Sequence, residues 1–310
     1  MSFLVQINES AYRPDALDGF TPTAPFNLNN AQAMMWLSQL AYETPEKSKV
    51  ESILRTWKMT LLGFRTNDPV TGLPPHSACV VAAGGRKATI ISFSGTDPLK
   101  IEDWITDFTA APSATGLHGG FESAVATVWP DVNAAIENRR DGEQALFFTG
   151  HSLGGALAIL AASRALSELK VAATAVYTFG SPRTGGIDFF NSYTPLLGNS
   201  TFRLVHGGDI VATVPPSQPI DFRHVGRAVQ CPTDAIFDAA TRIMPREDNE
   251  PNFLKSLVDD GLADFRALVG FRLLRRIGPR PLDRLAPLLP RMVRDHVPAN
   301  YFRALSIPLR

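Results

Sequence analysis

The chain has 310 residues, of which 45% are hydrophobic and 19% are charged. This composition provides for a large buried core and excludes a disordered or fibrous protein. The 30 Lys and Arg residues balance the 30 Asp and Glu residues, so the chain has no global field that would attract nucleic acid or an anionic membrane. Two cysteines alone exclude a disulfide framework and a cysteine zinc site.

The N-terminal third of the chain predicts an irregular arm, two helices and the antiparallel start of a sheet. The arm covers residues 1–28, which are rich in Pro, Asn and Asp. Helices are expected where apolar residues recur on one stripe, and strands where short apolar runs end in turn residues. The expected helices are Asn29 to Tyr42 and a second one after Pro45 as far as Arg55; the expected strands are Lys58–Arg65, Ala78–Ala83 and Ala88–Ser94, the last two joined as a hairpin by residues 84–87.

Strands and helices alternate further along the chain. This alternation favours parallel strands joined by crossover helices, so we expect an α/β fold with a mostly parallel central sheet and helices on both faces. Residues 232–295 are predominantly helical in pattern and indicate an insertion or cap within a single domain of residues 1–310. The alternating elements are helix Phe121–Arg139, strand Gln144–Thr149, helix Leu153–Leu169, strand Ala173–Phe179, a short helix near Phe189 and strand Thr201–His206.

The segment Gly150-His151-Ser152-Leu153-Gly154 matches the pattern G-x-S-x-G. The motif alone is weak, but an apolar β-like run precedes it and a helix of small residues follows it. A turn from strand to helix holds its serine in a strained conformation and lifts the hydroxyl clear of the backbone, and the helix N-terminus provides N–H groups for an oxyanion. Ser152 is therefore the candidate nucleophile; a passive helix-capping serine is the alternative.

Five ordered blocks surround and include this turn. They are Ile91–Thr96 with Asp103-Trp104 downstream, Leu117–Phe121, Thr149–Ala156, Thr178–Arg183, and Asp209–Val211 ahead of Val214–Pro216. In this order they resemble the class 3 lipases, the fungal-lipase-like α/β-hydrolases, from about Asn29 to Val229 and again near Asp295. The resemblance implies an α/β-hydrolase fold and a serine hydrolase activity on esters.

A serine hydroxyl needs a base within hydrogen-bond reach, and the base needs an acid that orients it. The leading acid is Asp209, which follows the β-like run Phe202–His206 at the end of the strand where active sites of such sheets lie. It also stands where the family has its catalytic aspartate. An Asx turn would explain Asp209 without catalysis. Asp188, at an apparent helix start, and Asp221 are weaker rivals.

Six histidines compete for the role of the base. His296 resembles the family's catalytic histidine, on a loop just before the terminal helix, and it is favoured. His224 starts the segment His-Val-Gly, which resembles a structural strand start in the family, and it is the main rival. A helix N-terminal residue without a catalytic role is the other interpretation of His296. His76 and His118 precede Ser152, His151 points away from Ser152 inside the turn, and His206 lies in a strand.

The oxyanion of an acyl transfer needs two hydrogen-bond donors. One is the backbone N–H of Leu153, directly after the nucleophile. The resemblance places the second at Thr96, through its N–H and its hydroxyl; a simple Gly-Thr turn is the alternative. Ser94 departs from the family, in which many members carry Arg at this position, so a structural ion pair of the loop is expected to be missing.

Two further segments are candidates for covering the site. Residues 97–116 lie where fungal lipases place a lid, and Ile101–Phe108 is amphipathic, although packing on the core explains the same spacing. Residues 261–310 contain ten Arg and three Asp, with an apolar side. Such a helix can lie on an anionic membrane, cap an acyl pocket or simply be solvated.

The sequence thus predicts a lipase-like carboxylic ester hydrolase that uses Ser152, Asp209 and His296 and requires no metal or organic cofactor. The expected substrate is a small-molecule or lipid ester, with transient contact to a lipid interface and no nucleic acid partner. A short-chain esterase, a phospholipase, an acyltransferase and a non-catalytic lipid-binding protein of the same fold are the alternatives. The first ten residues lack the pattern of a signal peptide, and no apolar run reaches 18 residues, so a cytoplasmic location is the default and secretion by another route stays open.

Overall fold

The computed structural model describes residues 6–66, 79–95, 113, 116–139, 145–215, 217, 221–238, 243–244 and 291–309. Its centre is an eight-stranded sheet in the order β1 to β8. Strands β3 to β7 are parallel, and the pairs β1–β2, β2–β3 and β7–β8 are antiparallel. The strands are β1 (Thr60–Arg65), β2 (Val80–Gly85), β3 (Ala88–Phe93), β4 (Ala145–His151), β5 (Ala175–Phe179), β6 (Thr201–His206), β7 (Arg227–Cys231) and β8 (Ile243–Met244).

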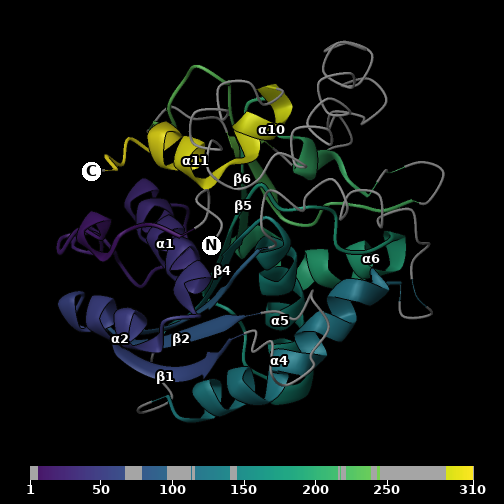
Figure 1. Cartoon of the computed structure of the whole chain (residues 1–310). Coiled ribbons are helices and arrows are strands. Elements are labelled where there is room, and N and C mark those ends of the chain that lie inside the picture. Colours follow the sequence, from purple (N-terminus) through teal and green to yellow (C-terminus); the bar gives the residue numbers. More distant parts are fainter. Residues whose placement is uncertain are drawn as a thin grey trace, which may run out of the picture.

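Helices cover both faces of the sheet (Figure 1). Helices α1 and α11 lie on one face, and α4 and α5 lie on the other. The α-helices are α1 (Leu28–Leu40), α2 (Lys47–Thr56), α4 (Gly119–Glu137), α5 (Leu153–Leu169), α6 (Ile187–Leu197), α10 (Arg291–His296) and α11 (Pro298–Ala304). Short 3-10 helices are η1 (Glu9–Ala11), η2 (Ala41–Glu43), η4 (Gly198–Ser200) and η5 (Ile210–Thr213). The expected α/β fold, with its antiparallel start, is confirmed.

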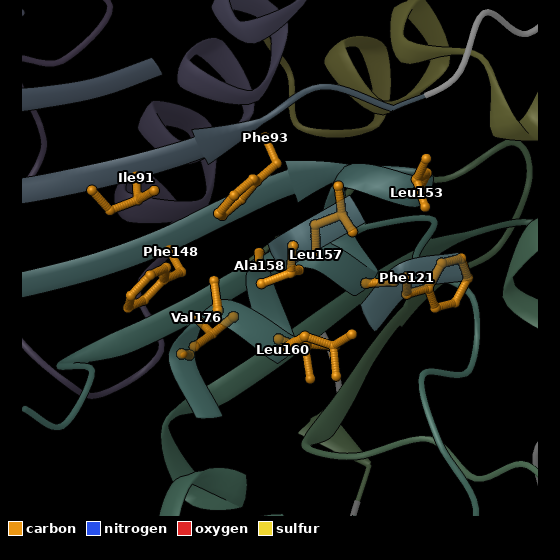
Figure 2. Packing of buried hydrophobic residues seen from close by; sticks show 14 of the residues in the cluster. Ile91, Phe93, Phe121, Phe148, Leu153, Leu157, Ala158, Leu160 and Val176 are labelled. Carbon is orange, nitrogen blue, oxygen red and sulfur yellow. The ribbon is translucent and has the colours of Figure 1, made fainter. Parts of the chain in front are cut away.

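The alternation of apolar side chains along the central strands explains the two layers of core. In β4, Leu146 and Phe148 face α4 and α5, whereas Phe147 between them faces α1. Because successive residues of a strand point to opposite faces, a strand buried on both sides must be apolar throughout. Figure 2 shows the α5 face, with Leu157 and Ala158 packed toward Phe148 and Val176. This packing fixes the start of α5 at the end of β4.

The hairpin between β2 and β3 is tighter than the sequence indicates. Gly84 and Gly85 belong to β2, and only Arg86 and Lys87 form the turn. Both turn residues have positive φ, 51° and 61°. Such a pair matches the twist of the two strands, which is why two-residue hairpins adopt it.

The structure differs from the sequence-based predictions at two places near the C-terminus, and it does not describe the residues of a third prediction. Residues 243–244 form β8, so this part of the expected helical insertion is a strand; most of residues 239–290 lies outside the described residues. His296 is the last residue of α10 and not part of a loop. The amphipathic segment Ile101–Phe108, Thr96 and the basic residues up to 290 also lie outside the described ranges. Among the described helices, none is long and apolar enough to cross a membrane.

Candidate active site

Ser152 occupies the turn between β4 and α5, in a backbone conformation that side chains rarely adopt. Its φ is 59° and its ψ is −131°. Such strain costs about 1–3 kcal/mol and persists only where the surroundings hold it. Here the Ser152 N–H donates to the carbonyl of Phe179, and the Gly155 N–H donates to the carbonyl of Ser152, both at 2.9 Å. The turn is therefore tied to β5 on one side and to the first turn of α5 on the other.

The glycines of the turn allow the close approach of neighbouring backbone. A Cβ atom on Gly150 would collide with the backbone of Gly154, and one on Gly154 would collide with the carbonyl of Phe93 at the end of β3. A Cβ on Gly155 would lie 2.7 Å from the Cβ of Ser181. These positions therefore have no room for a side chain. The tight contacts place Ser152 between the ends of β3 and β5.

The two segments expected to donate hydrogen bonds to an oxyanion both lie beside Ser152. Leu153 is the first residue of α5, and the first N–H groups of a helix have no acceptor within the helix. A Cβ on Gly95 would lie 2.9 Å from the Cβ of Ser152, so the loop that leads to Thr96 passes directly beside the serine. Ser94, where relatives carry Arg, is buried and donates its N–H to the carbonyl of Cys79 at 3.1 Å.

Asp209 and His296 form a buried pair although 87 residues separate them. His296 Nδ1 lies 2.8 and 2.9 Å from the two carboxylate oxygens of Asp209. A carboxylate only accepts hydrogen bonds, so Nδ1 carries the proton and Nε2 keeps a free electron pair. Within the described part of the chain, neither this Nε2 nor the Ser152 hydroxyl has a hydrogen-bond partner, and both residues are fully buried.

Tyr301 of α11 completes the surroundings of Asp209. Its hydroxyl donates to Asp209 Oδ2 at 2.6 Å, and the N–H of His206 donates to that hydroxyl at 3.2 Å. Burial raises the pKa of the Asp209 carboxyl, but the charge of His296 and the hydrogen bonds from His296 and Tyr301 outweigh burial and hold the pKa below its usual value. Burial and the Asp209 charge raise the pKa of the Tyr301 hydroxyl well above its ordinary value. Asp209 is therefore ionised and Tyr301 is neutral at neutral pH.

Asp295 joins the segment of His296 to that of Asp209. Its Oδ2 accepts hydrogen bonds from the Gly208 N–H at 2.9 Å and from the Thr233 hydroxyl at 3.0 Å. Gly207 has a φ of 57°, and a Cβ there would collide with this carboxylate. The residues directly before Asp209 and His296, Gly208 and Asp295, are thus hydrogen-bonded to each other. This bond holds the two segments of the pair together.

The rival residues take other roles in the structure. His224 Nε2 lies 2.7 Å from the carbonyl of Ala212, which it binds as a donor, and so His224 supports η5 and does not contact Asp209 through this nitrogen. Asp188 lies in the first turn of α6, as its sequence position indicates. Asp221 pairs with Arg223 at 2.7 Å at the surface. His206 Nε2 lies 2.9 Å from the carbonyl of Thr233.

Sequence reasoning did not single out Tyr42, Gly180 or the contacts of Tyr301. Gly180 has a φ of 57°, and a Cβ there would collide with Asp209 Oδ2 and lie 2.9 Å from His296 Nδ1. The glycine after β5 therefore leaves the space in which the pair meets. Its place in the block Thr178–Arg183 was a signal of importance, but only the fold shows what this residue adjoins.

Comparisons with known proteins fit this fold. The solved structure of Rhizomucor miehei lipase in its propeptide complex aligns with a TM-score of 0.58 at 20% identity, over 75% of this chain and 78% of that one. The mostly parallel sheet with an antiparallel start, the helices on both faces and the turn at Ser152 define an α/β-hydrolase fold.

Sequence similarity points to one group of proteins with this fold. Residues 90–218 match the family model described as Lipase (class 3). The Secreted mono- and diacylglycerol lipase 1 of Fusarium solani is 32% identical over 45% of this chain and 43% of its own length. The Lipase of Rhizomucor miehei is 32% identical over 56% and 47%. Residues 90–218 are thus similar to the class 3 lipases, and the chain spans about half the length of the curated relatives it matches.

Proposed function

We propose that this protein hydrolyses carboxylic esters, with Ser152 as nucleophile, His296 as base and Asp209 as the residue that orients the base. The observation that carries the proposal is the buried Asp209–His296 pair, whose free Nε2 lies in the same buried region as the strained Ser152. The ring of His296 lies 4.6 Å from the ring of His151, the residue directly before Ser152. The match of residues 90–218 to the class 3 lipase model supports the same chemistry.

The proposed reaction has two halves. His296 Nε2 takes the hydroxyl proton of Ser152 while Oγ bonds to the ester carbonyl carbon, and the carbonyl becomes an oxyanion bound by the Leu153 N–H and by Thr96. The bond to the alcohol oxygen breaks, and His296 gives that oxygen the proton, which leaves an acyl-enzyme. Water then attacks the acyl carbon, His296 takes its proton and returns it to Ser152, and the acid leaves. Asp209 stabilises the imidazolium in both halves.

We further propose a lipid ester with an apolar acyl chain as the substrate. The support is the names of the relatives, which describe a mono- and diacylglycerol lipase and a lipase. Binding of such a substrate entails transient contact with a lipid interface. Triacylglycerol, phospholipid and short esters are distinguished by the measurements below.

A fluorophosphonate probe tests the nucleophile directly, because it labels serines activated by a neighbouring base. The protein should be labelled stoichiometrically, and Ser152→Ala should abolish the label. Ser181→Ala is the matched control, since Ser181 is a buried serine close to the turn whose hydroxyl bonds to the carbonyl of Pro182. Absence of Ser152-dependent labelling would favour a non-catalytic binding protein of the same fold.

A series of p-nitrophenyl esters of rising chain length, with and without an emulsion, tests the substrate class. We expect activity to persist on long acyl chains and on emulsified substrate. Activity confined to soluble short esters would reject the lipase and leave an esterase. Added alcohol reveals an acyltransferase, because a new ester then replaces the free acid among the products.

A further inference from the structure

His151 is a buried titratable residue of the serine turn that the proposed reaction does not use. It is the last residue of β4, and its side chain is fully buried. Its ring contacts two partners from distant parts of the chain. Nδ1 lies 2.8 Å from the hydroxyl of Tyr42 in η2, and Nε2 lies 2.7 Å from the backbone carbonyl of His296.

The chemistry of the two partners determines which nitrogen carries the proton. A carbonyl oxygen only accepts hydrogen bonds, so Nε2 must be protonated to bind it. Nδ1 of the neutral ring is then an acceptor, and the Tyr42 hydroxyl donates to it. The result is a directed chain from Tyr42 through His151 to the main chain of His296. The carbonyl of His296 thus determines the tautomer of His151, and the Tyr42 hydroxyl holds the other side of the ring in place.

The two histidine rings also lie against each other. Their centroids are 4.6 Å apart with an interplanar angle of 35°, and Tyr301 packs edge-on against His151 at 5.7 Å. Burial and, after it, the charge of His296 lower the pKa of His151 to about 3, against the opposing effects of the hydrogen bond to His296 and of the Asp209 charge. His151 therefore stays neutral when its neighbour becomes imidazolium, and it adds no repulsion to the transition state.

The Tyr42 hydroxyl, which begins this series of hydrogen bonds, also lies against Gly95 beside Ser152. A Cβ on Gly95 would collide with the Tyr42 hydroxyl and with the carbonyl of His151, and would lie 2.9 Å from the Cβ of Ser152. The hydroxyl is thus packed between the loop that leads to Thr96 and the ring of His151. A shift of Tyr42 would therefore displace both the loop at Gly95 and the ring of His151.

We propose that His151 is a positioning residue for the base: oriented by the Tyr42 hydroxyl, its Nε2–H holds the backbone carbonyl of His296 and thereby keeps the His296 ring aimed at Ser152. This inference rests on the proposed function, in which His296 is the base. It assigns a role to the residue before the nucleophile, which the strand-to-helix turn does not need for its own geometry. Two side chains that take no part in the reaction steps then determine where the base lies.

The first test separates positioning from general stability. His151→Gln keeps an N–H donor at the reach of Nε2, and His151→Met has a similar length without a donor. Tyr42→Phe removes only the hydroxyl. We expect kcat on a soluble ester to fall roughly three- to tenfold in Tyr42→Phe and further in His151→Met, with KM within about twofold and partial recovery in His151→Gln.

Tyr193→Phe is the matched control, because it also removes a buried tyrosine hydroxyl, which bonds to Thr201 at 2.7 Å and not to a residue of the proposed site. It should lower the thermal midpoint and leave kcat unchanged. The proposal is overturned if kcat stays at the wild-type value in Tyr42→Phe and His151→Met, or if Gln and Met at position 151 reduce kcat equally. A wild-type protein without Ser152-dependent activity would instead reject the proposed function.

The second test needs no activity. NMR of ¹⁵N-labelled histidine reports the protonation of each ring nitrogen, and the Ser152→Ala protein serves as well as the wild type. We expect His151 to be protonated at Nε2 alone at pH 6, and Tyr42→Phe to shift the ¹⁵N resonance of Nδ1, which loses its hydrogen-bond donor, while Nε2 stays protonated. A doubly protonated ring at pH 6, or an Nδ1–H tautomer in the wild type, would overturn the proposal whatever the substrate proves to be.

Discussion

The carboxylate of Asp209 both closes an Asx turn and binds His296, two roles that the sequence left as alternatives. Its Oδ1 accepts the N–H of Val211 at 2.9 Å, which is the Asx turn that caps η5. The same group binds His296 Nδ1 and the Tyr301 hydroxyl. The local turn thus orients the carboxylate that the distant histidine meets. At the scale of the residue, the structural role supports the proposed functional one.

Asp209→Asn should keep the shape of this site but remove its charge and the fixed tautomer of His296. We expect kcat on a soluble ester to fall by about 10⁴-fold while the protein stays folded. Asp188→Asn, on the exposed first turn of α6, should leave kcat within about twofold. An Asp209→Asn variant that keeps more than about a tenth of wild-type kcat would remove Asp209 from the mechanism.

Gly180→Ala should damage the site through a single methyl group. The φ of 57° disfavours a side chain, and the new Cβ would collide with Asp209 Oδ2 and approach His296 Nδ1 to 2.9 Å. We expect kcat to fall more than tenfold, since the pair must move apart. Gly119→Ala is the control, because no atom lies within 4 Å of a Cβ at that helix position. Equal kcat in both variants would show that the pair tolerates displacement.

The helices and most strands follow their sequence patterns closely. Helix α5 begins and ends at the residues expected, Leu153 and Leu169, because a continuous run of small and apolar residues, buried from Leu153 to Ala162, follows a turn with glycine on both sides. The hairpin differs, since the periodicity of an apolar run does not determine which glycines pair across it. The cross-strand register, Gly84 with Thr89 and Gly85 with Ala88, leaves two residues for the turn.

Lys87→Gly tests the conformation of the turn between β2 and β3. Lys87 is exposed with a φ of 61°, a conformation that glycine adopts without strain. We expect the free energy of unfolding, measured in urea, to rise by about 0.5–1 kcal/mol. Ala134→Gly at an exposed position inside α4 should change it in the opposite direction, by about 1 kcal/mol. A loss of stability in Lys87→Gly would contradict the hairpin geometry.

For the whole molecule, two buried histidines make stability depend on pH. Burial lowers the pKa of His151 to about 3 and that of His118 to about 4, from the value of 6.5 in the unfolded chain. Between the folded and unfolded values the unfolded chain binds more protons, so stability is complete above pH 6.5 and is lost as the pH falls below it. His151 alone contributes roughly 2 kcal/mol of this loss at pH 5.

Urea denaturation at pH 7.5 and at pH 5 measures this loss. The midpoint should fall in the wild type, and the difference between the two pH values should shrink in His151→Gln and in His118→Phe. Phenylalanine suits position 118 because the ring of His118 already lies 4.3 Å from that of Phe121. An unchanged pH dependence in both variants would show that other groups cause the acid sensitivity.

The strand, the turn and the helix at Ser152 could be predicted from the sequence alone, because they depend on the local pattern of apolar residues and glycines. The sequence also pointed to Asp209 and His296, through chain order and the resemblance. Only the tertiary structure brought the two together across 87 residues and placed Tyr42, His151, Gly180 and Tyr301 around them. Local sequence limits backbone conformation, whereas contacts between distant side chains depend on the order of strands in the sheet and on the helices that pack against it.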